Sequence, residues 1–249
     1  ETACMRTLGD HPHVVRLLAT DESARALVIE RAVACLLEVV DQQPLHGVSL
    51  WAAIASIANG LEHIHACNYA HMDVKPDNVL YFSSGALKLC DVGMAVPADR
   101  PTALRCGTKA YAAPEVLASG ACDPRSADAW SLGVTVFGLA YGFLPFVIAD
   151  ASRDWRYAAF VGRAKNDSLH DCVLSWYGAD VTGDAPPFKV AQLLEVLLRV
   201  APSERARVTA DRSMGPRGAA ALLRVHFSGK LAESVSTSCT YNWRACVAE

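Results

Sequence analysis

The amino-acid sequence predicts an α+β fold, in which a small strand-bearing part is followed by a larger helical part. Early in the chain, short apolar runs are separated by a polar turn, as is typical of a β-hairpin. From Ser49 onward, apolar residues recur every three or four positions, which is the period of an amphipathic helix. With 249 residues, 52% of them hydrophobic, the chain can form one large globular domain or two small ones with a substantial core.

The first part of the chain predicts one helix, one hairpin and a second, longer helix. Residues 1–10 place their apolar side chains on one helical face, and Gly9 is suited to ending that helix. The apolar runs 13–20 and 25–32 flank a polar turn and predict two paired strands. Residues 49–68 then carry the apolar stripe of an amphipathic helix.

A second hairpin and several helices are predicted downstream. The segments 78–82 and 87–92 flank the turn sequence SSG, and residues 188–200 and 218–227 have helical periodicity. The run 132–149 has no charged residue and approaches the length of a membrane span. Glycines and a proline interrupt this run, so a buried helix of a large domain is the preferred interpretation.

Charge and cysteine content exclude several classes of function. Acidic and basic residues are interspersed, the formal net charge is −3 and the pI is near 6.3, so no nucleic-acid or membrane partner is expected. The nine cysteines stand singly, without zinc-site spacing, which favours reduced thiols in an intracellular, cytoplasmic protein. Because the chain opens with ETACMRTLGD, with neither an initiator Met nor a signal-peptide pattern, we expect it to be a fragment.

The sequence HMDVKPDN at 71–78 is followed by DVG at 91–93, with room for one hairpin between them. Three more motifs follow in order, namely GTKAYAAPE at 107–115, SADAWSLGV at 126–134 and APSERARVT at 201–209. This ordered set resembles the catalytic domain of eukaryotic-type protein kinases, from residue 1 to about residue 227. A single motif of this kind would be weak, whereas five in the correct order are specific.

The resemblance implies a role for each polar residue of the opening motif. Asp73 would accept the proton of the hydroxyl that attacks ATP, and Lys75 would place a positive charge beside the transferring phosphate. Asn78 and Asp91 would supply oxygen ligands to Mg²⁺ and so help to bind the nucleotide. A merely structural role for these residues, as turn or cap residues, is the less favoured alternative.

The resemblance also assigns the nucleotide site and the lobes. Glu1 would be the helix carboxylate that pairs with a phosphate-binding lysine, and the backbone of Glu30 and Ala32 would meet the adenine. The chain contains no G-x-G-x-x-G loop and no strand that carries this lysine. We therefore expect three regions, namely a partial N-terminal lobe, a C-terminal lobe and a tail, at residues 1–32, 33–227 and 228–249.

Several other residues are expected to support the structure. By resemblance, Asp128 would anchor the backbone of the catalytic loop, and Glu115 would form a buried ion pair with Arg205. His63 and His65 stand two apart on a helix and so do not share a face, which favours structural roles over a metal site. Cys90 is expected to be a packed thiol.

Some positions indicate the branch of the family, and others depart from its pattern. Lys75 and Thr108 resemble serine/threonine kinases, with a protein as substrate and ATP and Mg²⁺ as cosubstrates. Met72 replaces the arginine that often receives an activation-loop phosphate, so we expect no requirement for such phosphorylation. Val92 replaces the usual phenylalanine of the metal loop.

Two alternatives stay open: a catalytically inactive kinase-fold scaffold and a small-molecule phosphotransferase, although the latter class lacks the A-P-E and D-x-W-S-x-G elements.

Overall fold

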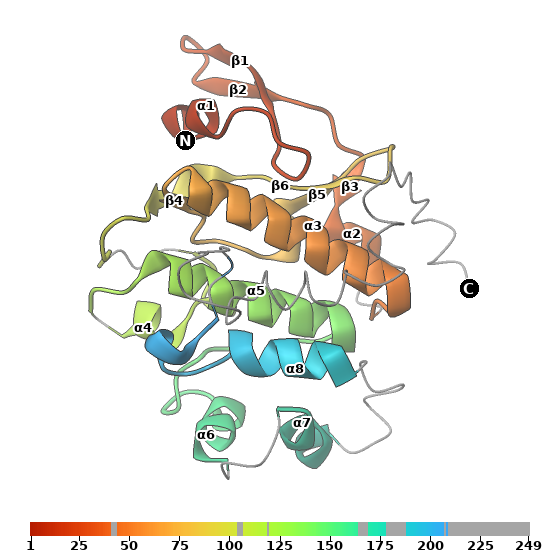
Figure 1. Cartoon of the computed structure of the whole chain (residues 1–249), viewed down its shortest axis with the longest axis vertical. Helices are drawn as coiled ribbons and strands as arrows, with labels where there is room; N and C mark the ends of the chain where they lie inside the picture. The colour runs from red at the N-terminus through yellow and green to blue at the C-terminus, as the bar shows by residue number, and fades with distance from the viewer. Residues whose placement is uncertain are drawn as a thin grey trace.

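The computed structural model describes residues 1–40, 44–103, 107–118, 120–163, 169–177, 188–206 and 208. Its elements are stacked in layers (Figure 1), with a small β-hairpin and helix at one end, a three-stranded sheet beside a long helix in the middle, and further helices at the other end. The predicted α+β fold is confirmed. The helix predicted over 218–227 and the tail 228–249 lie outside the described residues.

The N-terminal part contains helix α1 (Thr2–Leu8) and the antiparallel hairpin of β1 (Leu17–Asp21) and β2 (Ala26–Ile29). Helix α1 buries the three apolar residues predicted to share a face, Cys4, Met5 and Leu8, and is followed by Gly9, whose φ of 59° favours glycine. The first strand begins later than predicted. Residues 13–15 pair elsewhere, because Leu89 N–H donates to His13 O and Val15 N–H donates to Leu89 O.

The central sheet has the strand order β3-β5-β6 and is antiparallel throughout. Its strands are β3 (Ala34–Cys35), β5 (Val79–Tyr81) and β6 (Leu87–Leu89), and the short helix α2 (Leu36–Val40) follows β3. The 3₁₀ helix η1 (Pro76–Asn78) leads directly into β5. The polar motif at 71–78 is thus held against the first strand of the predicted hairpin, as its sequence position indicated.

Helix α3 (Gly47–Ala66) packs beside this sheet and buries the apolar stripe predicted from its sequence, namely Leu50, Ile54, Ile57, Leu61 and Ile64. Gly60 allows the segment around His13, which precedes β1, to approach α3 closely, because a Cβ at this position would lie 2.4 Å from His13 O. Two very short strands, β4 (Tyr69–Ala70) and β7 (Val96–Pro97), pair antiparallel, and the 3₁₀ helix η2 (Val92–Met94) lies between β6 and β7.

The larger part is built around helix α5 (Pro124–Tyr141), which is buried along almost all of its length. Gly142, with φ 78°, ends this helix, so the uncharged run 132–149 is divided between α5 and a following loop. Among the residues that the structure describes, no helix has both the length and the apolar character that crossing a membrane requires. Gly133 lets α5 contact helix α8 (Phe188–Leu197) closely, since a Cβ there would lie 2.9 Å from Leu197 Cβ.

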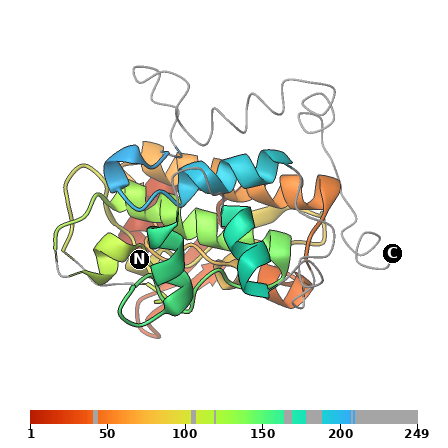
Figure 2. The same cartoon turned by 90° about the horizontal axis from the view of Figure 1, so that it is seen from below.

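The remaining helices lie around α5 and α8. Helix α4 (Pro114–Leu117) begins with the last two residues of the GTKAYAAPE motif, and η4 (Pro202–Glu204) follows α8. Helices α6 (Trp155–Gly162) and α7 (Leu169–Tyr177) lie side by side at the far end (Figure 2). Within the described ranges, Cys4, Cys35, Cys67 and Cys90 carry free thiols.

Candidate active site

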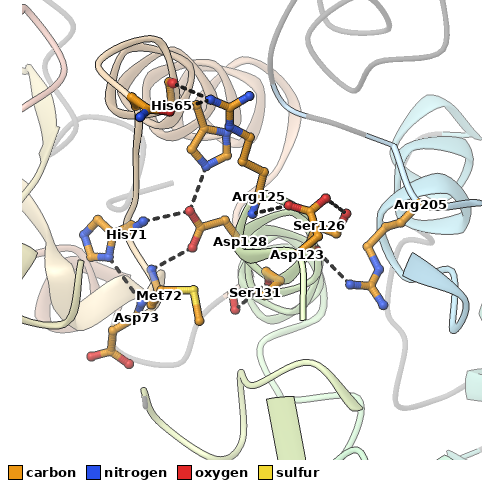
Figure 3. Close-up of polar contacts among 12 residues, drawn as sticks. His65, His71, Met72, Asp73, Asp123, Arg125, Ser126, Asp128, Ser131 and Arg205 are labelled. Atoms are coloured by element: carbon orange, nitrogen blue, oxygen red, sulfur yellow. Dashed lines mark hydrogen bonds and ion pairs between the residues drawn. The ribbon is translucent and has the colours of Figure 1, made fainter. Parts of the chain in front are cut away.

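The loop that follows β4 is anchored by Asp128, a fully buried carboxylate on α5. Its Oδ2 accepts the His71 N–H and its Oδ1 accepts the Met72 N–H, each at 2.7 Å (Figure 3). The Nε2 atom of His65 on α3 lies 2.7 Å from Oδ2. The predicted contact between Asp128 and the backbone of this loop is confirmed. The structure also gives His65 the structural role that its spacing predicted.

His71 links two segments of the site through its buried ring. The ring Nδ1 accepts the Asp73 N–H at 3.3 Å, so the other nitrogen, Nε2, donates to the Cys90 carbonyl at 2.9 Å. The Cys90 N–H in turn donates to Asn78 O at 2.9 Å. These contacts bring the strand that carries Asp91 next to the loop that carries Asp73 and Asn78.

The Asp73 carboxylate receives three hydrogen bonds from side chains and backbone. Lys75 Nζ lies 2.9 Å from Oδ2, Asn78 Nδ2 lies 3.0 Å from Oδ2, and the Thr108 N–H donates to Oδ1 at 2.7 Å. Burial by itself raises the pKa of Asp73, but the hydrogen bonds from Lys75 and Thr108 outweigh it and hold the pKa below its ordinary value. Asp73 is therefore an anion at neutral pH with its oxygens held in fixed positions.

The contact of Asp73 with Thr108 was not predicted from the sequence. Lys75 Nζ also donates to Thr108 Oγ1 at 2.6 Å, so Thr108 is held by both Asp73 and Lys75. The preceding Gly107 has φ 86°, and a Cβ there would lie 2.3 Å from Met72 O. The glycine of the GTK sequence is the one local signal of this close contact. A residue with a side chain would not fit at this φ so near the Met72 carbonyl.

Asn78 and Asp91 offer oxygen atoms of the type that Mg²⁺ prefers. The Asn78 Nδ2 donates to Asp73 O at 2.9 Å as well as to its carboxylate, which leaves the Asn78 Oδ1 as the atom that can bind a cation. Asp91 is exposed, with a left-handed backbone of φ 57°, and its Oδ1 accepts the Gly93 N–H at 3.2 Å. Within the described ranges, no group of three or more His, Cys, Asp or Glu side chains could hold a metal. Two protein ligands fit Mg²⁺, which often takes its other ligands from phosphates and water.

The Glu1 side chain reaches the DVG segment at 91–93. Its Oε2 lies 3.7 Å from the position that a Cβ on Gly93 would occupy. Among the described residues, no lysine or arginine side chain forms an ion pair with Glu1. The structure thus brings the Glu1 carboxylate beside the DVG segment.

The Glu30 side chain contributes to the structure of the strands. Its Oε1 accepts the Arg16 N–H at 2.8 Å and lies 2.6 Å from Lys88 Nζ. Burial raises the pKa of Glu30, but the hydrogen bonds from Lys88 and Arg16 lower it by a larger amount. The pKa of Glu30 is therefore below its ordinary value. Ala32 is half-buried and is followed by Val33, whose N–H donates to Tyr81 O at 2.8 Å. This bond holds the 30–33 segment against β5.

Two apolar residues flank Asp91. Val92 is buried, so the smaller side chain keeps an apolar contact at the position where phenylalanine is usual. Burial raises the pKa of Cys90 to about 12, with a smaller contribution from the Asp91 charge. The expectation that Cys90 is a packed thiol is confirmed.

An ion pair holds the end of the motif at 107–115 to the helical part. Arg205 Nη2 donates to Glu115 Oε2 at 3.0 Å, and Arg205 Nη1 donates to Ser126 O at 2.7 Å. The Arg205 guanidinium is buried and also lies over the Trp130 ring, 5.1 Å from its centroid. The predicted Glu115–Arg205 pair is confirmed, and its guanidinium is satisfied by several carbonyls as a buried charge requires.

The sequence was also compared with known proteins. It matches the protein kinase domain over residues 1–214. It is 42% identical over 161 residues to CBL-interacting protein kinase 4 of Oryza sativa, covering 59% of this chain and 34% of that protein. It is 32% identical over 232 residues to the serine/threonine-protein kinase PknL of Mycobacterium tuberculosis, covering 87% of this chain and 54% of that protein.

A third relative is the mitosis inhibitor protein kinase wee1 of Schizosaccharomyces pombe, which is 34% identical over 164 residues, 63% of this chain and 18% of that protein. The matches to these three proteins span between about a fifth and about half of their length. Together with the arrangement of Asp73, Asn78, Asp91 and Asp128, the match over residues 1–214 leads to one conclusion. The chain belongs to the protein kinase family.

Proposed function

We propose that the protein is a serine/threonine protein kinase that transfers the γ-phosphate of ATP to serine or threonine hydroxyls of proteins. The observation that carries this proposal is the Asp73 carboxylate, which Lys75, Asn78 and Thr108 hold in place as an anion. A carboxylate held in this way orients the incoming hydroxyl and accepts its proton. Lys75 places a positive charge where the transferred phosphoryl group carries negative charge.

Protein kinases generally use ATP with Mg²⁺. We propose that Asn78 and Asp91 hold the Mg²⁺, which neutralises phosphate charge when it is bound. The backbone of Glu30 and Ala32 would meet the adenine, while Glu1 would orient a lysine that binds the phosphates. On this proposal residues 1–32 form the part of the small lobe that the chain contains, and residues 33–227 form the large lobe.

The serine/threonine class is supported by the contact between Lys75 Nζ and Thr108 Oγ1 at 2.6 Å. Both residues belong to the pattern that favoured this class in the sequence. PknL, to which this chain is 32% identical over 232 residues, is itself a serine/threonine-protein kinase.

A catalytically inactive kinase-fold scaffold is the second candidate. The 249 residues contain no G-x-G-x-x-G loop, and Glu1 has no ion-pair partner within the described part of the chain. We therefore propose that a polypeptide of these 249 residues alone transfers phosphate slowly or not at all. Against the scaffold stands the convergence of Asp73, Lys75 and Asn78 on one point, since a binding surface has no physical need for it.

The experiment that separates the two candidates is a thermal unfolding measurement on the full-length protein that contains this domain. We expect ATP to raise the unfolding temperature in the presence of Mg²⁺ and much less without it, because only the folded state binds the complex. Asp91→Ala should abolish the Mg²⁺-dependent part of the shift. Asp10→Ala, which removes an exposed carboxylate away from the site, is the matched control and should keep it. No shift in the wild-type protein would favour the scaffold.

A further inference from the structure

An ion pair between Lys88 and Glu30 ties strand β6 to the segment that leads into β3. Lys88 Nζ lies 2.6 Å from Glu30 Oε1, and the two side chains are only 16% and 19% exposed. The ammonium group also lies over the Phe82 ring, 5.0 Å from its centroid. Because shielding from water strengthens the attraction between two charges, this pair is held more firmly than an exposed surface pair.

The same carboxylate oxygen also binds the backbone that precedes β1. Glu30 Oε1 accepts the Arg16 N–H at 2.8 Å, and the Glu30 N–H donates to Arg16 O at 3.2 Å. Glu30 is thus attached to Arg16 through both its side chain and its backbone. Although burial raises the pKa of Glu30, the hydrogen bonds from Lys88 and Arg16 outweigh it, so the carboxylate is ionised at neutral pH.

Lys88 stands on a strand that is hydrogen-bonded on both sides. In the central sheet it lies opposite Leu80 of β5. On the other side of β6, the backbone of Leu89 exchanges hydrogen bonds with residues 13–15. A cation carried by such a strand has a fixed base, from which it can hold the Glu30 carboxylate in one position.

The backbone from Glu30 to Val33 is held at both of its ends. The Glu30 carboxylate, with its partners, holds one end. At the other end, the Val33 N–H donates to Tyr81 O at 2.8 Å. The position of the backbone N–H and C=O groups between these ends therefore depends on the Lys88–Glu30 pair, and a side-chain substitution can remove that pair.

We propose that Lys88 is a positioning residue for the nucleotide, which acts through Glu30 on the backbone that meets the adenine. This inference rests on the proposed function, in which the backbone of Glu30 and Ala32 binds the adenine. Hydrogen bonds to a base require donors and acceptors in fixed positions, so a displaced segment binds adenine less tightly. Because the adenine contact is the same before and during phosphate transfer, Lys88 should affect KM for ATP and not kcat.

The test compares ligands that carry adenine with one that does not. Dissociation constants of the full-length protein for adenosine, ATP with Mg²⁺, and inorganic tripolyphosphate with Mg²⁺ are measured by isothermal titration calorimetry. In Lys88→Met we expect adenosine and ATP each to bind about five- to tenfold more weakly, which corresponds to the loss of about one hydrogen bond. Tripolyphosphate should bind as it does to the wild type. KM for ATP should rise by the same factor as the dissociation constant of ATP, with kcat unchanged.

Two further variants assign the effect to the ion pair. Lys88→Arg keeps the positive charge and should restore wild-type adenosine binding. Glu30→Gln should weaken adenosine binding as Lys88→Met does, and the double variant should bind no more weakly than either, since both changes remove the same interaction. If Lys88→Met does not fold, Glu30→Gln and Lys88→Arg decide the question, because the first should weaken adenosine binding and the second should not.

Arg163→Met is the matched control. Arg163 pairs with Glu195 at 3.1 Å and lies over the Phe160 ring, so it resembles Lys88 in its surroundings but belongs to the helical part of the molecule. This variant should bind adenosine as the wild type does. The inference is wrong if Lys88→Met binds adenosine as tightly as the wild type, or if Arg163→Met weakens adenosine binding by as much as Lys88→Met.

Adenosine binding needs no phosphate transfer, so it separates this inference from the proposed function. If transfer is absent but adenosine binds and Lys88→Met weakens the binding, the kinase function fails and the positioning role stands. If transfer occurs with the same KM for ATP in the wild type and in Lys88→Met, the kinase function stands and the positioning role fails. If the wild type binds no adenosine, the positioning role also fails.

Discussion

Asp128 holds Met72 in a left-handed backbone conformation: Oδ1 of Asp128 accepts the Met72 N–H at 2.7 Å, at a residue whose φ is 66°. A non-glycine residue adopts this φ at a cost, and persists there only where surrounding contacts enforce it. The buried carboxylate supplies two such contacts, to Met72 and to His71. The position of the adjacent Asp73 thus depends on a residue more than fifty positions later in the chain.

We predict that Asp128→Ala destabilises the protein by about 3 kcal/mol or more, because it leaves two buried N–H groups and a buried imidazole without their acceptor. The free energy of unfolding is measured by urea denaturation. Asp123→Ala, at the N-cap of the same helix, is the control: it removes the cap and the hydrogen bond from the Ser126 hydroxyl, both near the helix end, and should cost about 1 kcal/mol. Equal losses for the two variants would contradict the anchoring role.

Removing the Glu115–Arg205 ion pair should lower the free energy of unfolding. Arg205→Met leaves a carboxylate and several carbonyls without a donor, and we expect a loss of about 3 to 5 kcal/mol in the free energy of unfolding. The comparison variant is Asp10→Ala, which breaks an exposed contact to Arg16 and should leave the unfolding midpoint unchanged. A stable Arg205→Met variant would show that this pair is not needed for the fold.

Gly107→Ala tests whether the 107–108 segment must lie against the catalytic loop. A Cβ there would meet Met72 O at 2.3 Å, and φ 86° is unfavourable for alanine. Because the segment must move and Thr108 would leave Asp73, we expect kcat/KM of the full-length protein to fall by about ten- to hundredfold. Gly120→Ala, where a Cβ would meet nothing within 4 Å, should have no effect on activity.

The stability of the fold should fall at mildly acidic pH because of His11. Burial, together with the neighbouring His63, His13 and Lys88, lowers the pKa of His11 from 6.5 to about 4. Between these two pH values the unfolded chain binds a proton that the folded chain does not, so the free energy of unfolding decreases as pH falls from 6.5 to 4 and levels off below.

The variant His11→Asn keeps an acceptor for the His13 N–H and removes the titrating ring. Its free energy of unfolding, measured by urea denaturation at a series of pH values, should decrease less steeply between pH 6.5 and 4 than that of the wild type. His46→Asn, at an exposed position, serves as the control and should keep the wild-type slope. Parallel curves for wild type and His11→Asn would refute the assignment to His11.

Met72 should make activity independent of activation-loop phosphorylation. Its side chain is apolar and buried, so it offers no positive charge to a phosphate. We expect phosphatase treatment of the full-length protein, and the variants Thr102→Glu and Thr102→Val, to leave kcat/KM unchanged. A large loss of activity after phosphatase treatment that Thr102→Glu prevents would overturn this expectation.

Much of this architecture followed from local sequence patterns. The apolar stripe of α3 and the burial of Cys4, Met5 and Leu8 on α1 follow from helical periodicity, which depends only on nearby residues. The contacts of Asp128 and of the Glu115–Arg205 pair followed from the resemblance of ordered motifs, because their partners lie far away along the chain.

The features that the sequence missed depend on long-range pairing. Strands β3, β4 and β7 have two residues each, too few for a period of two to be recognised. Residues 13–15 pair with Leu89 instead of extending β1, which no local pattern indicates. The hydrogen bond from Thr108 to Asp73 joins residues 35 positions apart and depends on how two loops pack.

The most direct test of the kinase assignment is transfer of the γ-phosphate from labelled ATP to a serine peptide by the full-length protein with Mg²⁺. We predict transfer by the wild type, and a loss of at least about a hundredfold in Asp73→Asn, which keeps the shape of the side chain but removes the base. Unfolding temperatures of the two proteins would confirm that both are folded. Equal transfer by wild type and Asp73→Asn, or none by the wild type, would contradict the assignment of Asp73 as the catalytic base of a protein kinase.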